Sequence, residues 1–434
     1  MLDLIKWKNK IRRQPLLIEG ARQVGKTWLM QEFGQTQYKN VIYVNFDDNN
    51  EAKNIFKADL RPNRIIKELE ILFKQKIDSK DTLIIFDEIQ EANTALRSLK
   101  YFCEDAPQYN IVSAGSLLGV AIHKGQSFPV GKVDMLKLYP LTFAEFLYAI
   151  GEDSIIQVMD KQDWQTLKNF SARIISNLKY YYYVGGMPKA VLSFVETNDL
   201  EAVRHEQSII LSNFENDFSK HITTMSIPKT AVIWNSIPKQ LAKENKKFMY
   251  KELQAGARAA QFEDSLYWLE KVGLVHKILK VCDPLLPLIA YSDQFVFKLF
   301  TLDIGLLSAK AGLELSAFVE ADNNLFKYFK GALTEQFVLQ ELKAAKSDLP
   351  IYYWTREKGL AEIDFIIQYK NNIIPIEAKS AYNTKAKSLK NYIETYNPNI
   401  AIRTSLMDYG QNMHLYDIPL YMIGRLNEII DRSK

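Results

Sequence analysis

The first third of the chain alternates short apolar runs with segments of helical spacing. In residues 62–77, apolar side chains recur three and four positions apart, as they do on one face of an amphipathic helix. The short runs lack strict alternation, which is typical of strands that a parallel sheet buries on both faces. These predicted strands lie in residues 15–19, 41–46, 82–90, 110–113 and 133–141. The order of elements predicts an α/β domain over residues 1–150.

A glycine-bounded loop follows the first predicted strand. It reads GARQVGKT, fits the pattern GxxxxGK[ST] at every fixed position, and leads into a segment of helical spacing. Glycines allow backbone N–H groups to curl around a phosphate, and the helix N-terminus adds a favourable dipole. We therefore predict an ATP site in which Lys26 reaches the β- and γ-phosphates and Thr27 is a ligand of Mg²⁺. The residues expected to contact the nucleotide are Gly20, Ala21, Arg22, Gln23, Val24, Gly25, Lys26 and Thr27.

Two carboxylates follow the apolar run of residues 83–86. Parallel α/β folds place their sites at the carboxyl ends of the strands. We expect Asp87 to contribute to Mg²⁺ binding and Glu88 to orient and polarise the attacking water. Two acids after a strand often mark only a turn, and the phosphate loop upstream is what favours the catalytic interpretation.

Two other polar positions in this domain have two interpretations each. Ser116 follows the predicted strand 110–113, where it would either sense the γ-phosphate or form a simple Ser/Gly turn. Lys132 follows Gly131, where it would either supply a cation to a neighbouring copy or be an ordinary solvated lysine.

Five segments together resemble bacterial and archaeal AAA-type ATPases that carry a C-terminal domain of unknown function with a nuclease-like fold. They are GARQVGKT, TLIIFDEIQ, SAGSLLG, LYPLTFAEFL at 138–147 and GGMPKAV at 185–191. The resemblance implies a P-loop AAA-type core followed by a small helical lid. It also implies that Pro188, in the turn that begins at Gly186, lies near the nucleotide. Where such proteins often have an arginine after the glycine, this chain has Lys132.

The middle of the chain is predicted to be helical and then to form a winged helix. Residues 150–235 are rich in helical spacing, and we interpret Tyr180–Tyr183 as packing of the lid rather than as a platform for stacked bases. Residues 248–281 read as two short helices and a wing strand. A helix that reads DNA is usually basic on its outer side, but here Arg258 is accompanied by several acids. We interpret the module as structural or protein-binding, with groove reading as the alternative.

An acidic cluster with one lysine is predicted near the C-terminus. Glu335 lies close to the apolar seam of a predicted helix, Asp364 lies in a strand, and Glu377 and Lys379 lie in the next strand. Residues two apart on a strand point to the same face, so Glu377 and Lys379 would stand side by side. Carboxylate oxygens suit Mg²⁺, which would stabilise transition-state charge while Lys379 either positions the water or neutralises the phosphate. The predicted metal ligands here are Glu335, Asp364 and Glu377, with orientation of a metal-bound water as the alternative role of Glu335.

This arrangement resembles the PD-(D/E)XK nuclease superfamily, including its upstream helix acid. The resemblance implies a C-terminal α/β domain of restriction-endonuclease-like fold in which Asp364, Glu377 and Lys379 are catalytic. Cutting and binding remain alternatives, because many members of the superfamily bind without cutting. Lysines at 385, 387 and 390 lie where a phosphate backbone would pass.

Composition narrows the class of protein. The 434 residues are 47% hydrophobic and 24% charged, which excludes a disordered or collagen-like chain. The net charge of +4 is too balanced for a surface that grips nucleic acid throughout. Cys103 and Cys282 form no CxxC pair, which disfavours a cysteine zinc site. Without a long apolar run or a signal-peptide pattern, we expect a cytoplasmic protein with no membrane partner.

The complete prediction has four domains. They are the ATPase core (1–150), a helical lid (151–235), a winged-helix-like module (236–320) and the nuclease-like domain (321–434). We predict that the protein binds and hydrolyses ATP with Mg²⁺, and that its C-terminal domain binds or cleaves DNA. Two alternatives remain: an ATP-dependent switch or scaffold that binds a partner without cutting, and a nuclease regulated by the ATPase. The sequence leaves both a monomer and a homo-oligomer open.

Overall fold

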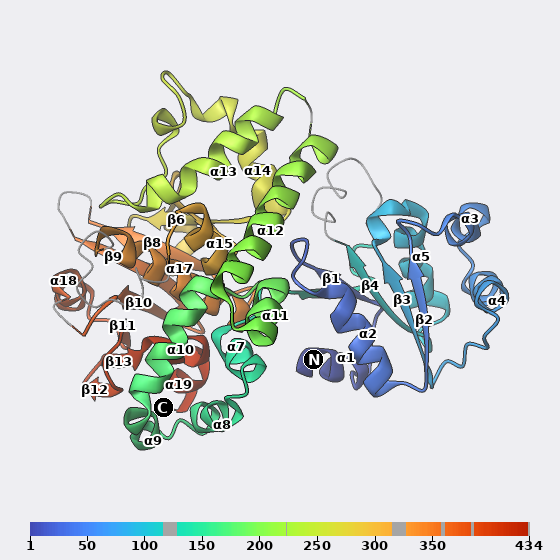
Figure 1. Cartoon of the computed structure of the whole chain (residues 1–434), viewed down its shortest axis with the longest axis horizontal. Coiled ribbons are helices and arrows are strands. Elements are labelled where there is room, and N and C mark those ends of the chain that lie inside the picture. Colours follow the sequence, from blue (N-terminus) through green and yellow to red (C-terminus); the bar gives the residue numbers. More distant parts are fainter. Residues whose placement is uncertain (116–127, 223, 315–326, 357–360, 383–385, 433–434) are drawn as a thin grey trace. The chain divides into compact units, whose positions relative to one another are not determined.

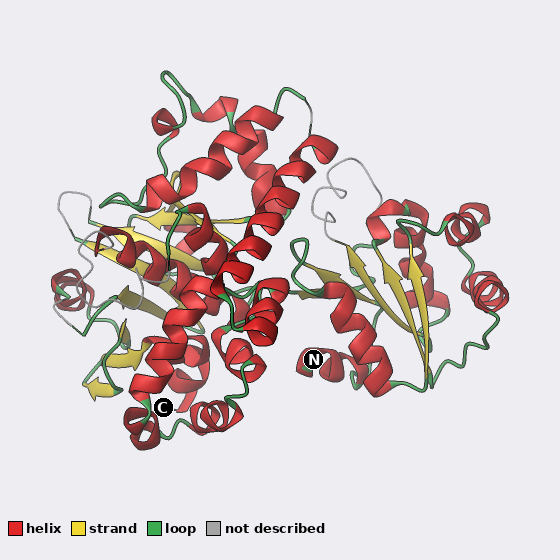
Figure 2. Cartoon of the chain, in the orientation of Figure 1, coloured by secondary structure: helices red, strands yellow, loops and turns green. Residues whose placement is uncertain are grey.

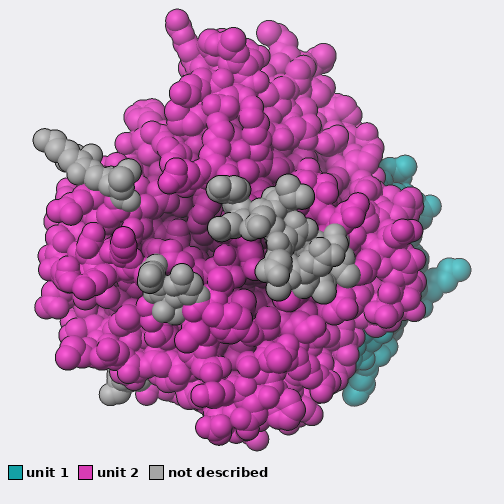
Figure 3. All heavy atoms as spheres, turned by 60° about the vertical axis from the view of Figure 1, so that its left-hand side comes forward, with its two compact units in different colours: residues 1–138, 271–273 teal, residues 139–270, 274–434 magenta. Residues whose placement is uncertain are grey.

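The described residues of the computed structural model form two compact units (Figure 1). Both units combine helices and strands (Figure 2). Unit 1 consists of residues 1–138 and 271–273, and unit 2 of residues 139–270 and 274–434, coloured teal and magenta in Figure 3. No described helix is long and apolar enough to cross a membrane. The structure describes residues 1–115, 128–222, 224–314, 327–356, 361–382 and 386–432.

Unit 1 contains a five-stranded sheet in the order β2-β3-β4-β1-β5, with parallel pairing throughout. The predicted α/β fold with a parallel sheet is therefore confirmed for this part of the chain. Its strands are β1 Leu16–Glu19, β2 Asn40–Asn45, β3 Thr82–Asp87, β4 Asn110–Gly115 and β5 Asp134–Lys137. Its helices are α1 Leu2–Lys8, α2 Lys26–Gln37, α3 Asn50–Ala58, α4 Pro62–Phe73, η1 Ile89–Glu91 and α5 Asn93–Asp105.

Helices cover both faces of this sheet. The side chains of β3 alternate, so that Leu83 and Ile85 pack with α1 and α2, while Ile84 and Phe86 pack with α3, α4 and α5. Burial on both faces explains why this strand is a continuous apolar run. Because the strands are parallel, their carboxyl ends share one edge of the sheet. The loop after β1 and the acids at the end of β3 lie at that edge.

Unit 2 begins with a helical region in which the tyrosine run is part of the core. Tyr181, Tyr182 and Tyr183 are buried, so these three tyrosines pack as predicted. Its first helices are α7 Phe143–Ala149, α8 Asp153–Lys161, α9 Trp164–Asn169, α10 Ser171–Val184, α11 Pro188–Thr197, α12 Leu200–His221 and α13 Ile227–Leu241. The later ones are η3 Tyr250–Glu252, η4 Ala259–Gln261, α14 Glu263–Lys271, η5 Leu288–Tyr291, α15 Ile304–Lys310, α17 Lys327–Ala345, α18 Lys387–Tyr396, η7 Leu420–Arg425 and α19 Leu426–Arg432.

An eight-stranded mixed sheet forms the other part of unit 2, in the order β12-β13-β11-β10-β9-β8-β6-β7. Residues Leu389 and Tyr392 of α18 pack with Trp354, Ile366 and other side chains of this sheet. Its strands are β6 Val275–Val281, β7 Ser292–Thr301, β8 Ile351–Thr355, β9 Glu362–Tyr369, β10 Asn372–Ala378, β11 Ala401–Ser405, β12 Gly410–Asn412 and β13 Leu415–Pro419.

The strand that we interpreted as a wing belongs to this sheet. β6 pairs with β7 in an antiparallel hairpin, as a wing strand would, but it also pairs with β8 in parallel. Backbone hydrogen bonds therefore join the predicted winged module to the predicted nuclease-like domain. The four-domain division stays a prediction, while the described residues divide into two compact units.

Candidate functional site

The loop after β1 turns directly into the first residue of α2. Gly25 has a φ of 93° at the N-terminal cap of this helix, a left-handed conformation that favours glycine. Ala21 and Val24 are buried and anchor the loop. Since the helix begins at Lys26, the N–H groups of its first turn lack helical partners, which is the arrangement that attracts a phosphate.

Lys26 is folded back into the loop. Its Nζ donates to the carbonyl oxygens of Gly20 at 2.9 Å and of Ala21 at 2.7 Å, and the residue is 7% exposed. Burial lowers the pKa of Lys26 to about 8, although Glu88 and Asp87 oppose this shift. Neutral carbonyl groups therefore hold a buried ammonium group at the position where the sequence predicts a phosphate.

Thr27 and Asp87 meet, although 60 residues separate them in the chain. The Thr27 hydroxyl donates to Asp87 Oδ2 at 2.6 Å, and the Tyr43 hydroxyl donates to the same oxygen at 2.9 Å. Asp87 Oδ1 accepts the backbone N–H of Glu88 at 3.0 Å. Two oxygen donors side by side fit the predicted Mg²⁺ site. Tyr43 was not predicted from the sequence. The one feature that could have indicated it is its hydroxyl group, which is polar within the otherwise apolar run of β2.

Glu88 has an unusual backbone conformation. Its φ of 48° lies in the left-handed region, which residues other than glycine adopt uncommonly and often at functional positions. The side-chain amide of Gln90 donates to Glu88 Oε2. The conformation ends β3 and begins the short helix η1, so Glu88 follows Asp87 at the carboxyl edge of the sheet.

In unit 2, the carboxylate of Glu335 in α17 forms ion pairs with two lysines from other elements. Lys298 Nζ of β7 lies 3.1 Å from Glu335 Oε2, and Lys246 Nζ contacts Glu335 Oε1. Lys298 also lies 2.6 Å from Glu362 Oε1 at the start of β9. Burial alone would raise the pKa of Glu335, but Lys246 and Lys298 lower it below its ordinary value.

The other predicted acids lie in the same cluster. Asp364 Oδ2 accepts the backbone N–H of Ala378 at 2.8 Å, and Lys379 Nζ lies 2.5 Å from Glu377 Oε1. Burial raises the pKa of Asp364, and the charges of Glu335 and Glu377 raise it further. Burial also raises the pKa of Glu377, against the effect of Lys379. The structure thus brings Glu335, Asp364, Glu377 and Lys379 together, as the sequence predicts.

The contacts of this acidic cluster do not fit the predicted Mg²⁺ ion. Both oxygens of Glu335 face ammonium groups, and one oxygen each of Asp364 and Glu377 is also engaged. Glu377 Oε2 is buried without a hydrogen-bond partner in the described part of the chain. Within the described ranges, no three or more His, Cys, Asp or Glu side chains are arranged to hold a metal. The ligand roles of Glu335, Asp364 and Glu377 stay predictions.

Comparison with known families identifies the N-terminal part. Residues 12–147 match the family model of an AAA domain. The AAA-type prediction is confirmed for this stretch. Residues 175–317 and 330–422 match two models described as domains of unknown function, DUF8612 and DUF4143. No curated protein matches the sequence.

Three solved structures resemble the chain at low TM-scores, which carry no functional inference. The Walker-type ATPase PABY2304 of Pyrococcus abyssi has a TM-score of 0.43 and 13% identity, covering 70% of this chain and 93% of its own. The Orc1 protein of Aeropyrum pernix in complex with DNA has a TM-score of 0.26 and 14% identity, and the match covers 71% of this chain and 89% of that one. Can2 of Sulfobacillus thermosulfidooxidans in complex with cyclic tetra-adenylate has a TM-score of 0.21 and 11% identity, and the match covers 97% of this chain and 99% of that one.

The roles predicted for Ser116, Lys132 and Pro188 stay predictions. Ser116 lies outside the described residues. Lys132 forms an ion pair of 2.9 Å with Glu104. Pro188 begins α11 in unit 2, where its expected role beside the nucleotide stays a prediction. In the phosphate loop, Gln23 Oε1 is buried without a hydrogen-bond partner within the described ranges.

The turn before Pro188 is packed within unit 2. A Cβ atom on Gly186 would lie 2.1 Å from the carbonyl oxygen of Leu141, so only glycine fits there. The N–H of Gly186 donates to Asp303 Oδ2 at 2.6 Å, and Asp303 also caps α15 through the N–H of Leu306. The buried Asp303 carboxylate thus joins this turn to the start of α15.

Helix α17 carries further buried polar side chains. Gln336 accepts the N–H of Thr301 at 3.0 Å and donates to its carbonyl at 2.8 Å. Gln340 accepts the N–H of Ile304 at 2.9 Å, and its amide lies 2.9 Å from the Tyr181 hydroxyl. Glu341 Oε1 accepts the N–H of Phe143 at 2.8 Å. The helix that carries Glu335 is therefore hydrogen-bonded to four neighbouring elements, β7, α15, α10 and α7.

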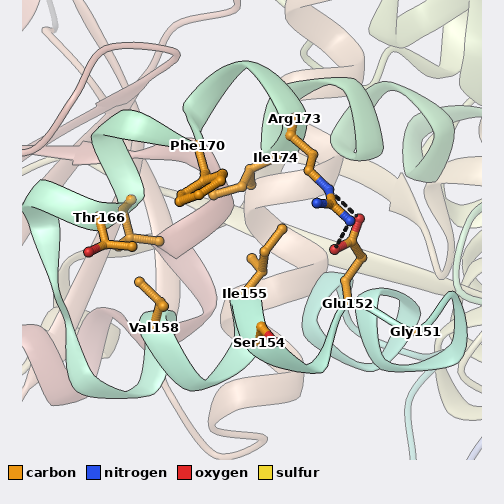
Figure 4. Close-up of a pocket in the computed structure, with 10 residues that line it drawn as sticks. Gly151, Glu152, Ser154, Ile155, Val158, Thr166, Phe170, Arg173 and Ile174 are labelled. Carbon is orange, nitrogen blue, oxygen red and sulfur yellow. Dashed lines mark hydrogen bonds and ion pairs between the residues drawn. The ribbon is translucent and has the colours of Figure 1, made fainter.

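A pocket of about 260 Å³ lies between α8, α9 and α10 (Figure 4). Figure 4 shows the ion pair of Glu152 and Arg173, whose contacts are 2.8 Å, beside the apolar side chains of Ile155, Phe170 and Ile174. None of the predicted catalytic or ligand-binding residues lines it.

Proposed function

We propose that the chain binds and hydrolyses ATP in its AAA domain, and that nucleotide turnover controls DNA binding by its C-terminal domain. The observation that carries the first part is the contact of Thr27 with Asp87 beside the buried Lys26. These groups come from the first two residues of α2, directly after the loop that follows β1, and from the end of β3, the two positions where the sequence predicts the nucleotide site.

The residues of the phosphate loop would bind the nucleotide with their backbone N–H groups, from Gly20 to Gly25. Lys26 would exchange its carbonyl contacts for phosphate oxygens, and Thr27 and Asp87 would hold Mg²⁺. When bound, Mg²⁺ would neutralise charge on the β- and γ-phosphates. Glu88 would orient the attacking water, while Ser116 would sense the γ-phosphate and Pro188 would lie near the nucleotide.

Calorimetry with the full chain tests the nucleotide site. We expect Lys26→Ala to abolish ATP binding, because the loop then lacks the buried ammonium group that would reach the β- and γ-phosphates. Lys132→Ala is the matched control, since this lysine already pairs with Glu104 at the surface. Undiminished affinity in Lys26→Ala would show that the phosphate loop is misassigned.

DNA binding by the C-terminal domain is supported by cations beside one groove. Lys387, Lys390 and Arg403 line a groove of about 520 Å³ between α18 and strands β11 and β13, together with Glu394 and apolar side chains. Arg403 pairs with Asp417, and Lys390 Nζ lies 3.8 Å from Glu394, so the proposal relies on Lys387 and Lys390. Lysine and arginine side chains along a groove suit a phosphate backbone. Filter binding of labelled duplex and single-stranded DNA, at two salt concentrations, tests this proposal. Lys387→Glu with Lys390→Glu should weaken binding, whereas charge reversal at Arg258 should matter only if the winged module reads DNA.

Mg²⁺-dependent cleavage of DNA is the second candidate function, and it requires that Mg²⁺ displace the lysine contacts of Glu335 and Glu377 described above. The observation in its favour is that Asp364, Glu377 and Lys379 converge with Glu335, with Glu377 Oε2 buried and unpartnered within the described residues. Nicking of plasmid DNA with Mg²⁺ or Mn²⁺, with and without ATP, tests it. Nicking that survives both Asp364→Asn and Lys379→Ala would rule out this active site. If wild-type protein nicks no DNA form, the ATP-dependent switch or scaffold that binds a partner without cutting is favoured.

We also expect the protein in the cytoplasm. Sedimentation with and without ATP would show whether it forms a homo-oligomer.

A further inference from the structure

We propose that lysines of this chain take the place of a divalent cation in the C-terminal acidic cluster. The cluster, hereafter the lysine-paired centre, comprises the carboxylates Glu335, Glu362, Asp364 and Glu377 and the ammonium groups of Lys246, Lys298 and Lys379. The inference concerns the second candidate function and distinguishes it from binding without cutting. It does not depend on the nucleotide site.

Lys298 is the internal cation of this centre. The residue is 0% exposed, and its Nζ lies between Glu335 Oε2 at 3.1 Å and Glu362 Oε1 at 2.6 Å. The ring of Tyr353 lies below the same ammonium group, with 5.0 Å from Nζ to the ring centroid. A buried ammonium group needs carboxylate partners. Lys298 therefore pairs with two carboxylates that could otherwise be ligands of a metal ion.

Lys246 approaches Glu335 from another direction. Its Nζ contacts Glu335 Oε1, and its side chain is 16% exposed. The backbone of Lys246 has a φ of 39°, which is a strained conformation for a lysine. Because Lys298 faces the second oxygen, both oxygens of Glu335 are paired with ammonium groups.

The charges of the centre nearly balance. Four carboxylates and three ammonium groups leave a formal charge of −1, and the backbone N–H of Ala378 also satisfies Asp364. A divalent ion entering this centre would meet buried ammonium groups a few ångströms away, where like charges repel strongly. Displacing Lys246 or Lys298 would then leave that lysine without its buried partner.

Binding of Mn²⁺ to the full chain without nucleotide tests the inference. Electron paramagnetic resonance measures the free ion, and Asp364→Asn removes the carboxylate at the middle of the centre. We expect wild type and Asp364→Asn to bind Mn²⁺ equally weakly. Saturable binding by wild type that is lost in Asp364→Asn would overturn the proposal.

Two variants test the role of the lysines directly. Lys246→Met and Lys298→Met shorten the side chain by one atom and remove one positive charge each, and Lys390→Met is the control outside the centre. We expect Mn²⁺ affinity to rise at least tenfold in either centre variant and to stay unchanged in the control. If neither variant binds Mn²⁺ better than wild type, lysines are not what keeps the ion out. Lys246→Met covers the case in which Lys298→Met fails to fold, because Lys246 is partly exposed.

Failure of this inference and failure of the proposed function give different results. ATP affinity, measured by calorimetry on the same variants, should equal that of wild type, because the substituted lysines lie outside the phosphate loop. Loss of ATP binding in Lys26→Ala alone tests the nucleotide site. Nicking by wild type together with Asp364-dependent Mn²⁺ binding would overturn the inference and support cleavage.

Discussion

The phosphate loop and the lysine-paired centre both bury lysines, but they pair them differently. In unit 1, Lys26 donates to backbone carbonyl groups of Gly20 and Ala21, which are neutral. In unit 2, Lys298 donates to the carboxylates of Glu335 and Glu362, which are charged. A cation held by neutral groups can pair with an arriving anion, whereas a cation held by carboxylates is already neutralised.

The acids differ in the same way. Among the described residues, the hydrogen-bond donors to Asp87 are the hydroxyl groups of Thr27 and Tyr43 and the backbone N–H of Glu88. Glu335 and Glu377 receive ammonium groups. Neutral donors leave the charge of Asp87 available to a metal, while ammonium groups compensate the charge of the other acids. The charge on the hydrogen-bond partners of a buried ionic side chain therefore distinguishes the two kinds of site. Neutral partners leave the charge available to a ligand, whereas oppositely charged partners neutralise it within the protein.

The largest expected effect concerns Lys298. Its replacement by methionine leaves Glu335 and Glu362 buried with one cation fewer, which should lower the free energy of unfolding by about 3–5 kcal/mol. Urea unfolding followed by tryptophan fluorescence measures the change. Lys390→Met, at a highly exposed position of α18, should leave stability nearly unchanged. A Lys298→Met protein as stable as wild type would break the comparison, because Lys298 would then contribute no charge pairing.

Glu88 gives the next effect. Glu88→Gln should reduce ATP hydrolysis by about 10²–10⁴-fold, since an amide cannot polarise the attacking water as a carboxylate does. Phosphate release measures the rate, and calorimetry should show ATP binding close to that of wild type. Glu91→Gln, three residues along and exposed, is the matched control. Equal rates in the two variants would assign the reaction to another group.

A pH effect on stability is expected from Glu341. Burial raises its pKa from 4.5 to about 7, so the folded state holds this proton more tightly than the unfolded state. The stabilisation is fully present below about pH 4.5 and is lost as the pH rises through about 7. The free energy of unfolding, measured with urea between these pH values, should therefore receive a contribution from Glu341 that falls as the pH rises. Glu341→Gln should lack this pH-dependent contribution. An identical pH slope in the variant would mean that Glu341 does not titrate there.

The smallest effect is expected at Lys132. Because the ion pair with Glu104 is exposed, Lys132→Ala should leave ATP hydrolysis unchanged within experimental error, at any protein concentration. Phosphate release measured across a dilution series tests this. A loss of rate that appears only at high concentration would instead indicate a cation supplied to a neighbouring copy.

Local patterns predicted the elements of unit 1 because their causes are local. The apolar run of β3 reflects burial on both faces, and the loop sequence at 20–27 reflects the backbone that a phosphate needs. The spacing of the C-terminal motif also predicted that Asp364 lies beside Glu377, since the two strands pair across a short turn. The roles of the four motif residues stay predictions.

The partners of that motif could not be predicted in the same way. Lys246 and Lys298 lie 89 and 37 residues from Glu335 and belong to no motif, so only the three-dimensional packing brings them together. The pairing of β6 with β8 was missed for the same reason. The alternation of apolar and polar residues along a strand does not indicate which second strand pairs with it.

The side chains of α17 make the angular position of this helix unusually specific. Glu335, Gln336, Gln340 and Glu341 each have a separate buried partner, and these partners lie on different sides of the helix axis. One inserted residue between Gln336 and Gln340 would turn the rest of the helix by about 100°. Gln340 and Glu341 would then lose their partners while Glu335 kept its own. We therefore expect homologous chains to keep the residue spacing within this helix.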